Sequence, residues 1–253
     1  MKDSSRSIQD QFGQVAANYR TSVVHAQGAE LDRIQALAAE LGTPYALDAG
    51  CGAGHTSIAL APACQEVVAF DLTAAMLSQV EQLAAEKGLA NIRTEQGDVA
   101  NMPFPDATFD LVASRYSAHH WLFLRQALAE CRRVLKPAGR FPLCDIIAPE
   151  DLAVDTFLQT LEYLRDPSHV RDHRLSEWET HLAAAGFRID RVTQWHLDLQ
   201  LDRWTQRMNT PTIKVEMLRQ LMAEASEEAS RELRIRPDGW FAIPATLIEA
   251  TAI

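Results

Sequence analysis

The chain has 253 residues, of which 47% are hydrophobic and 23% are charged, and its formal net charge is −10. This composition supports one large core or two small ones, and the negative field disfavours non-specific binding to nucleic acid, because phosphate backbones are repelled. No apolar run approaches the ~20 residues that a membrane-spanning helix needs.

Strand and helix patterns alternate along the chain, which predicts a parallel sheet covered by helices on both faces. The strands are expected at residues 45–50, 66–72, 91–98, 109–116, 140–147, 188–199 and 239–253. The helices are expected at residues 26–41, 73–88, 121–139 and 175–187. Pro137 and Gly139 should end the third helix. Pro142 and Pro244 argue against fully paired positions, so the last strand is expected at an edge or with a bulge.

The sheet's core is expected within residues 44–148, completed by residues 175–199 and 240–253. Three segments fall outside it: residues 1–25, 150–174 and 202–236. We expect a single domain, residues 1–253, in which these mostly helical additions build the substrate side of a catalytic site. A lid and a homodimer contact are the alternative roles for them.

The stretch ALDAGCGAGHTS places glycines directly after a short apolar strand that ends in Asp48. Gly50, Gly52 and Gly54 leave the main chain bare, so a ligand can approach it at the carboxyl end of the sheet. A dinucleotide is one candidate, but His55 follows Gly54, and the G-x-G-x-x-G spacing is missed by one position. Asp48 would repel a diphosphate and suits a ligand with a positively charged group.

Two further acids follow the next two strands. Asp71 stands about 20 residues after the glycine loop, where an acid accepts hydrogen bonds from ribose hydroxyls. Asp98 follows the third strand, where it can accept from an adenine amino group. One acid at a strand end is more often a turn cap. Three acids at the ends of successive strands predict a ligand with a ribose, a cationic part and no phosphate. S-adenosylmethionine has this composition.

Four segments resemble class I S-adenosylmethionine-dependent methyltransferases, within them the type 11 methyltransferase domain family of ubiquinone/menaquinone-biosynthesis-like enzymes: LDAGCGAGH, VAFDLTAAML, GDVANMPFPDATFDLVASRYSAHHW and ECRRVLKPAGRFPLCDI. The resemblance covers residues 12–148, and the closing strands more loosely. It implies a Rossmann-like α/β fold with seven mostly parallel strands, the last one antiparallel. It also implies S-adenosyl-L-methionine as cofactor and S-adenosyl-L-homocysteine as product.

The resemblance further implies which residues contact the cofactor: Asp48, Gly50 and Gly52 at the methionine, Asp71 at the ribose, Leu72 and Met76 beside the adenine, and Asp98 with Val99 at its edge. Arg115 is implied to lie near the methionine carboxylate, which suits a guanidinium fork. In the segment ANYRTSVVHAQG, Tyr19 and His25 would close over the cofactor as a lid. A half-buried aromatic ring and a polar group at a helix start are the alternative interpretations.

The segment SRYSAHHW follows the fourth strand, where the methyl donor and the acceptor should meet. His119 and His120 are the catalytic candidates, because an imidazole can orient an acceptor or take its proton near neutral pH. The alternative is that one of them caps the following helix and packs. His169 and His173 lie in the additional segment and either line the acceptor pocket or lie at the surface, which we favour.

We therefore expect methyl transfer to an oxygen, carbon or amine of a small molecule, aromatic molecules included. The chain lacks the Asp/Asn-Pro-Pro-Tyr motif used on nucleobase or amide nitrogens, and it lacks a cysteine cluster of the arsenite-methylating type. Two alternatives remain. One is a non-catalytic cofactor-binding protein on the same fold, and the other is a nicotinamide-dependent oxidoreductase, against which Asp48 and His55 count.

The compartment is expected to be the reducing cytoplasm. The first residues, MKDSSRSIQDQF, are polar and unlike a signal peptide. The four cysteines are scattered without metal-ligand or disulfide spacing, so no metal site is expected. Beyond a small-molecule acceptor, we expect no nucleic-acid partner and no membrane span.

Overall fold

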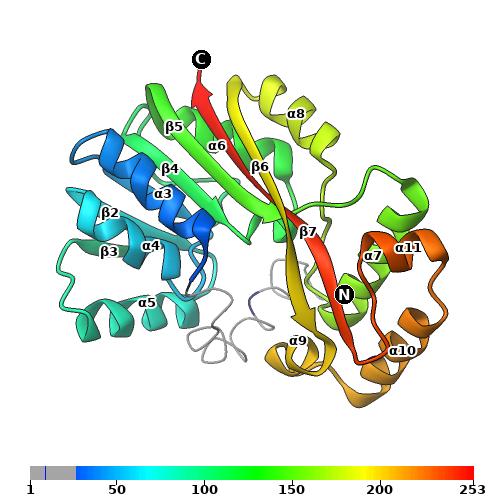
Figure 1. Ribbon diagram of the computed structural model, residues 1–253. Helices are drawn as coiled ribbons and strands as arrows, with labels where there is room; N and C mark the ends of the chain where they lie inside the picture. The colour runs from blue at the N-terminus through cyan, green and yellow to red at the C-terminus, as the bar shows by residue number, and fades with distance from the viewer. Residues whose placement is uncertain (1–8, 10–26) are drawn as a thin grey trace.

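The computed structural model describes residue 9 and residues 27–253. Its strands form one seven-stranded sheet in the order β3-β2-β1-β4-β5-β7-β6 (Figure 1). The strands are β1 (Tyr45–Ala49), β2 (Glu66–Asp71), β3 (Ile92–Gln96), β4 (Phe109–Arg115), β5 (Leu135–Ile146), β6 (Phe187–Gln200) and β7 (Trp240–Ala252). Neighbours among β1 to β5 are parallel, whereas β7 runs antiparallel to both β5 and β6. The predicted Rossmann-like fold with an antiparallel last strand is confirmed.

Helices cover both faces of this sheet. One face carries α3 (Ala29–Glu40), α4 (His55–Leu60), the short 3-10 turn η1 (Ala61–Ala63) and α5 (Ala74–Glu86). The other face carries α6 (Leu124–Val134) and α8 (Leu175–Ala184). Strand β2 serves both layers: Val67 packs into the first core, and Val68 and Phe70 pack into the second. Burial on both faces explains why the strands read as continuous apolar runs in the sequence.

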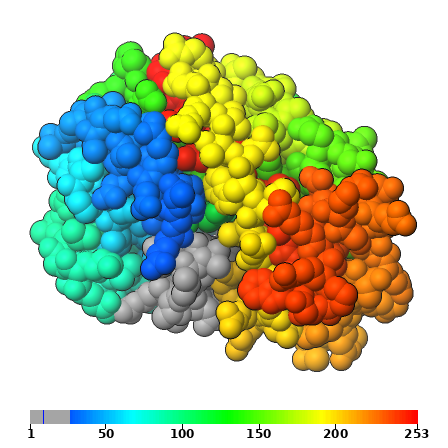
Figure 2. Space-filling view, in the orientation of Figure 1, coloured from blue at the N-terminus to red at the C-terminus, as the bar shows by residue number. Residues whose placement is uncertain are grey.

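A second lobe forms where β6 and β7 extend beyond β5. It is built from α7 (Leu152–Arg165), α9 (Leu201–Arg207), α10 (Thr212–Ala223) and α11 (Glu227–Glu232), and these helices gather at one end of the sheet (Figure 1). Figure 2 shows β6 running across the surface between α3 and this lobe. Leu158, Trp204 and Phe241 belong to one buried apolar cluster, so the segments 150–174 and 202–236 pack together rather than separately.

Two details of the sequence prediction were wrong. Helix α6 ends at Val134 rather than at Gly139, because Leu135 is already extended and pairs with Phe109 of β4. Strand β7 is an interior strand without a bulge at Pro244, and this residue lies opposite His196. Pro244 is tolerated there because it stands just past Ala245, the last residue of β7 that is paired with β5.

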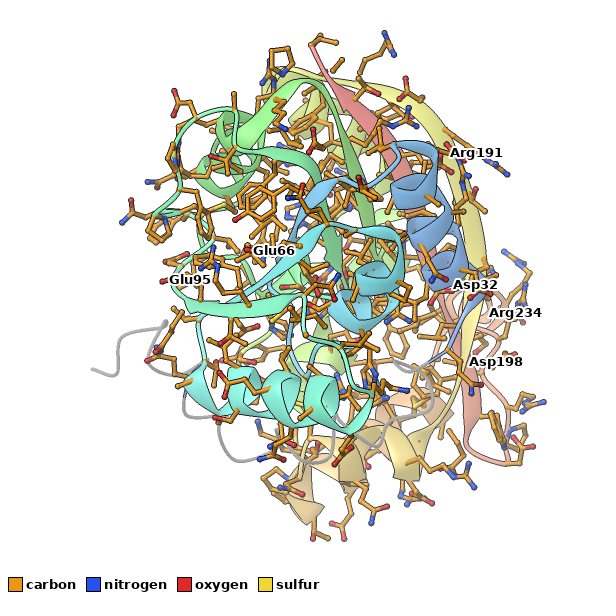
Figure 3. All side chains as sticks on the ribbon, turned by 90° about the vertical axis from the view of Figure 1, so that its left-hand side faces the viewer. Asp32, Glu66, Glu95, Arg191, Asp198 and Arg234 are labelled. Carbon is orange, nitrogen blue, oxygen red and sulfur yellow. The ribbon has the colours of Figure 1, made fainter. Side chains whose placement is uncertain are left out.

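Charged side chains lie around the rim of the sheet (Figure 3). Glu66 on β2 and Glu95 on β3 both pair with Arg93, at 3.4 and 2.9 Å, and these partly exposed pairs add little stability. Within residues 27–253, no helix has the length and apolar character that crossing a membrane requires.

Candidate active site

An open pocket lies at the carboxyl ends of the parallel strands. Strand β1 lies between β2 and β4. The chain passes from β1 to β2 on one side and later crosses from β3 to β4 on the other side, and open α/β sheets bind ligands where the strand order reverses in this way. The pocket is lined by residues of the four loops that follow β1 to β4: Gly50 to Ala53, His55, Thr56, Asp71 to Thr73, Met76, Gly97 to Val99, Arg115 to Ser117 and His120 to Leu122.

The glycines of the first loop serve two different purposes. Gly50 has φ +72°, and a Cβ there would lie 1.9 Å from the hydroxyl oxygen of Ser117, so no side chain fits. Gly52 has φ +50° and nothing within 4 Å of a Cβ, so its main chain faces the pocket bare. Gly54 has φ +90° and packs against Val80 of α5. The third glycine therefore supports helix packing rather than ligand contact.

Four amides of this loop, those of residues 50, 51, 52 and 54, are occupied within the protein. The N–H groups of Gly50 and Cys51 both donate to the carbonyl of Phe70, at 2.8 and 3.0 Å, and that of Gly54 donates to Cys51 at 2.9 Å. The N–H of Gly52 donates to Oδ2 of Asp71 at 2.9 Å. A diphosphate is normally held by such loop amides, and these four already have acceptors within the protein.

Asp71 joins the first two loops. Its Oδ2 accepts from Gly52, and its Oδ1 accepts from the N–H of Thr73 at 2.9 Å. Burial raises the pKa of the Asp71 carboxyl, and these backbone hydrogen bonds oppose the rise. Asp71 also lines the pocket, so a ligand there can reach its carboxylate.

Asp48 lies beneath the loop and is not among the pocket-lining residues. It is 1% exposed, and its Oδ2 accepts from the hydroxyl of Ser57 at 2.6 Å. Burial raises the pKa of Asp48 to about 7, against the opposing effect of the Ser57 hydrogen bonds. Asp48 therefore supports the loop from below. Its expected position facing the methionine stays a prediction.

The expected adenine side of the pocket is assembled from the next two loops. Leu72, Met76, Asp98 and Val99 all line the pocket. Oδ1 of Asp98 accepts from the N–H of Ala100 at 2.8 Å, which fixes the carboxylate in its turn. The structure thus brings these predicted residues together, and their contacts with an adenine stay a prediction.

Arg115 ends β4 inside the pocket. Its guanidinium pairs with Glu30 of α3 at 2.7 Å, with both side chains buried, and lies 4.7 Å from the centre of the Tyr116 ring. Tyr116 has φ +52°, an uncommon conformation for a large residue, and its N–H donates to Cys144. The sequence did not point to Glu30 or Tyr116, because neither contact is visible from local spacing.

The rings of the paired histidines lie 4.2 Å apart between centres but have different surroundings. The ring of His120 lines the pocket, whereas His119 does not; its Nδ1 lies 2.6 Å from Oδ1 of Asp145. Burial opposes a charge on His119, but the Asp145 carboxylate more than offsets this and raises the pKa of His119 to about 9. Burial and the adjacent His119 cation lower the pKa of His120 to about 4. Asp145 was not predicted as a partner of His119, although an acid within the apolar run PLCDII was a visible signal of a buried polar contact.

His169 is buried rather than at the surface, contrary to the placement favoured from the sequence. Its ring centre lies 5.8 Å from that of His119, and Nε2 contacts Oε1 of Gln159 at 2.9 Å. His173 lies farther along the same segment, with its ring centre 5.2 Å from that of Trp178. Neither is a pocket-lining residue. Tyr19 and His25, the two predicted lid residues, lie outside the described residues.

Comparisons with known proteins agree with this arrangement. The model of the methyltransferase domain family matches residues 47–143. YcgJ, an uncharacterized methyltransferase of Bacillus subtilis (strain 168), is 40% identical over 218 residues, which are 86% of this chain and 86% of that protein. Its crystal structure matches with a TM-score of 0.82 and 36% identity, over 87% of this chain and 98% of the other.

Two further matches cover the same core. A demethylmenaquinone methyltransferase of Deinococcus radiodurans is 34% identical over 155 residues, 58% of this chain and 64% of that protein. A structure of geranyl diphosphate methyltransferase in complex with S-adenosylmethionine shares the fold, with a TM-score of 0.63 and 19% identity over 89% of this chain and 85% of the other. The chain therefore belongs to the class I S-adenosylmethionine-dependent methyltransferases.

Proposed function

We propose that this protein transfers a methyl group from S-adenosylmethionine to a small molecule, with the donor in the pocket at the ends of β1, β2 and β4. The observation that carries the proposal is the occupied loop: Gly52 presents bare main chain, yet its N–H is donated to Asp71 rather than offered to a phosphate. A dinucleotide cannot use this amide, or those of residues 50, 51 and 54, without displacing their present acceptors, whereas an adenosyl ligand with a sulfonium needs none of them.

The roles of the pocket residues follow from their chemistry. Asp71 accepts from the ribose hydroxyls, and Asp98 with Val99 meets the adenine edge between Leu72 and Met76. Gly50 and Gly52 allow close approach of the methionine moiety, and Arg115 attracts its carboxylate. The buried acid Asp48, whose pKa burial raises to about 7, is partly ionised below the loop near neutral pH, and a positively charged ligand would favour its ionised form.

When bound, the cofactor supplies an electrophilic methyl group on a positively charged sulfur, which departs as a neutral thioether. The chain mainly has to bind and orient the two reactants, an effect worth up to ~7–11 kcal/mol in well-arranged cases. His120, at the pocket wall, is the residue that can orient an acceptor or take its proton. His119 supports this wall from behind through Asp145.

The acceptor is a small molecule that carries an oxygen, nitrogen or carbon nucleophile. The name of the Deinococcus relative adds quinones such as demethylmenaquinone to the candidates, although that relative matches only 58% of this chain. Residues 150–174 and 202–236 form the substrate side in this proposal, within a single domain of residues 1–253.

The test is the release of S-adenosyl-L-homocysteine across a panel of phenols, quinones and amines. We expect release with at least one class and none without an acceptor. Calorimetric titration with S-adenosylmethionine and with NADH runs in parallel. Binding of NADH in preference to S-adenosylmethionine would contradict the proposal, and binding without turnover would favour a non-catalytic role.

A further inference from the structure

His120 is held by one short turn of the chain, residues 166–168, which follows α7. Its Nδ1 lies 3.1 Å from the carbonyl oxygen of Ser168. A carbonyl can only accept, so Nδ1 must carry the hydrogen and donate it. In the neutral ring, Nε2 is therefore left as the proton acceptor.

The same turn places a carboxylate beside that second nitrogen. Oδ2 of Asp166 lies 3.9 Å from Nε2 of His120; the Asp166 side chain is 1% exposed and that of His120 is 12% exposed. This distance is too long for a hydrogen bond. Once the ring is protonated, however, the two groups form an ion pair at this distance. Asp166 is 1% exposed, and within the described part of the chain its Oδ2 has no hydrogen-bond partner.

The turn itself is rigidly bonded. Oδ1 of Asp166 accepts from the N–H of Ser168 at 2.8 Å and from its hydroxyl at 2.5 Å. The next residues anchor the turn to the pocket wall, because the N–H groups of Val170 and Arg171 donate to the carbonyl of His119. Asp166 therefore cannot swing away from His120 without breaking these contacts.

We propose that Asp166 is the positioning residue of His120: it fixes the turn whose Ser168 carbonyl accepts the Nδ1 hydrogen, and it stabilises the imidazolium that forms when the methyl acceptor loses its proton. This inference rests on the proposed function. The acceptor's X–H proton goes to Nε2, and its electron pair forms the bond to the methyl carbon, whose former bonding pair stays on sulfur. The substrate class is thereby narrowed to acceptors that carry a removable proton on the nucleophilic atom.

Other charged groups surround His120 and set the background for a test. His119 of the same turn opposes a positive charge on it, and Asp145 of β5 favours one. His169 lies 6.5 Å away between ring centres, and Glu162 and Arg165 of α7 pair with each other nearby at 3.5 Å. Replacing His119 with Asn removes the nearest cation and keeps a donor for Asp145.

The experiment is an NMR titration of the His120 ring, which needs neither cofactor nor acceptor. Loss of one signal in His120→Gln assigns it among the eight histidines. In the wild-type protein at neutral pH, we expect the hydrogen on Nδ1 and an unprotonated Nε2. In the His119→Asn variant, the pH at the midpoint of the His120 titration should rise by at least about one unit, into an easily measured range.

Adding Asp166→Asn to His119→Asn should then lower that midpoint by about one to three pH units. Asn keeps the Oδ1 acceptor of the turn, and its amide can donate to Nε2, which favours the neutral ring. Asp166→Glu keeps the charge and should keep the midpoint within about half a unit. Asp155→Asn is the matched control, because this buried acid of α7 pairs with Arg171 instead and should leave His120 unchanged.

An unchanged midpoint in His119→Asn/Asp166→Asn would overturn the inference, and so would a wild-type ring with its hydrogen on Nε2. The second result is available even if the Asp166 variants fail to fold. If the midpoint shifts as expected but no acceptor of the panel is methylated, the proposed function fails while the pairing of Asp166 with His120 stands.

Discussion

Replacing Asp71 with Ala tests the link between the glycine loop and the cofactor. Its carboxylate accepts from two backbone amides, those of Gly52 and Thr73, both at 2.9 Å. The Ala variant leaves both donors without this acceptor and removes the group that we assign to the ribose hydroxyls. Stability and cofactor affinity should therefore fall together.

The magnitudes follow from these contacts. The loss of a charged acceptor destabilises the folded protein by about 1–3 kcal/mol for each backbone donor. Part of this loss is offset, because burying the Asp71 carboxylate is itself unfavourable and the Ala variant removes that carboxylate. We expect a loss of about 2–4 kcal/mol in the free energy of unfolding. The lost ribose contact should cost about 1–3 kcal/mol more in binding, a weakening of roughly 5- to 150-fold.

The assays are chemical denaturation and calorimetric titration with S-adenosylhomocysteine. Asp71→Asn keeps the shape and one acceptor, so both effects should be smaller in that variant. Glu95→Gln is the control, because this exposed acid pairs with Arg93 at the rim and lies outside the pocket. A folded Asp71→Ala variant with wild-type affinity would refute the assignment of Asp71 to the ribose.

Three further predictions concern the pocket wall. Gly50→Ala combines φ +72° with a Cβ 1.9 Å from Ser117, so we expect a loss of about 2–5 kcal/mol on denaturation. Gly42→Ala, at φ +69° with open space, should lose only about 1–2 kcal/mol; equal losses would show that the contact with Ser117 is unimportant. The raised pKa of His119, from 6.5 to about 9, means that its stabilising effect is complete below pH 6.5 and lost as pH rises through 9. The stability difference between wild type and His119→Asn, at most about 3 kcal/mol from this source, should therefore shrink from pH 6 to pH 9, and a constant difference would exclude a charged pair. His120→Gln should lower turnover by about 10²- to 10⁴-fold with unchanged S-adenosylhomocysteine affinity, and wild-type turnover would return His120 to a packing role.

The sequence predicted the parts of the molecule that depend on local pattern. Apolar strands followed by acids and glycines identified the sheet, its carboxyl edge and the lining of the pocket, because parallel strands must end on one side. Asp71, Asp98 and Arg115 line the same pocket for this reason. The glycine spacing was informative as well, although Gly54 turned out to support helix packing.

The remaining features depend on contacts between distant segments. Asp145 lies 26 residues after His119, and Asp166 lies 46 residues after His120, so no local spacing links either pair. The position of Pro244 inside the sheet depends on where β5 ends, which only the assembled register shows. Side-chain pairing of this kind is decided by the fold rather than by neighbouring residues.

The most direct measurement is a crystal structure of the protein with S-adenosylhomocysteine. We expect the ribose hydroxyls within hydrogen-bond distance of Asp71, the adenine between Leu72 and Met76, and the sulfur on the side of the pocket that His120 lines. A ligand bound elsewhere, or with its ribose away from Asp71, would contradict the central claim that this loop and its acids hold an adenosyl methyl donor.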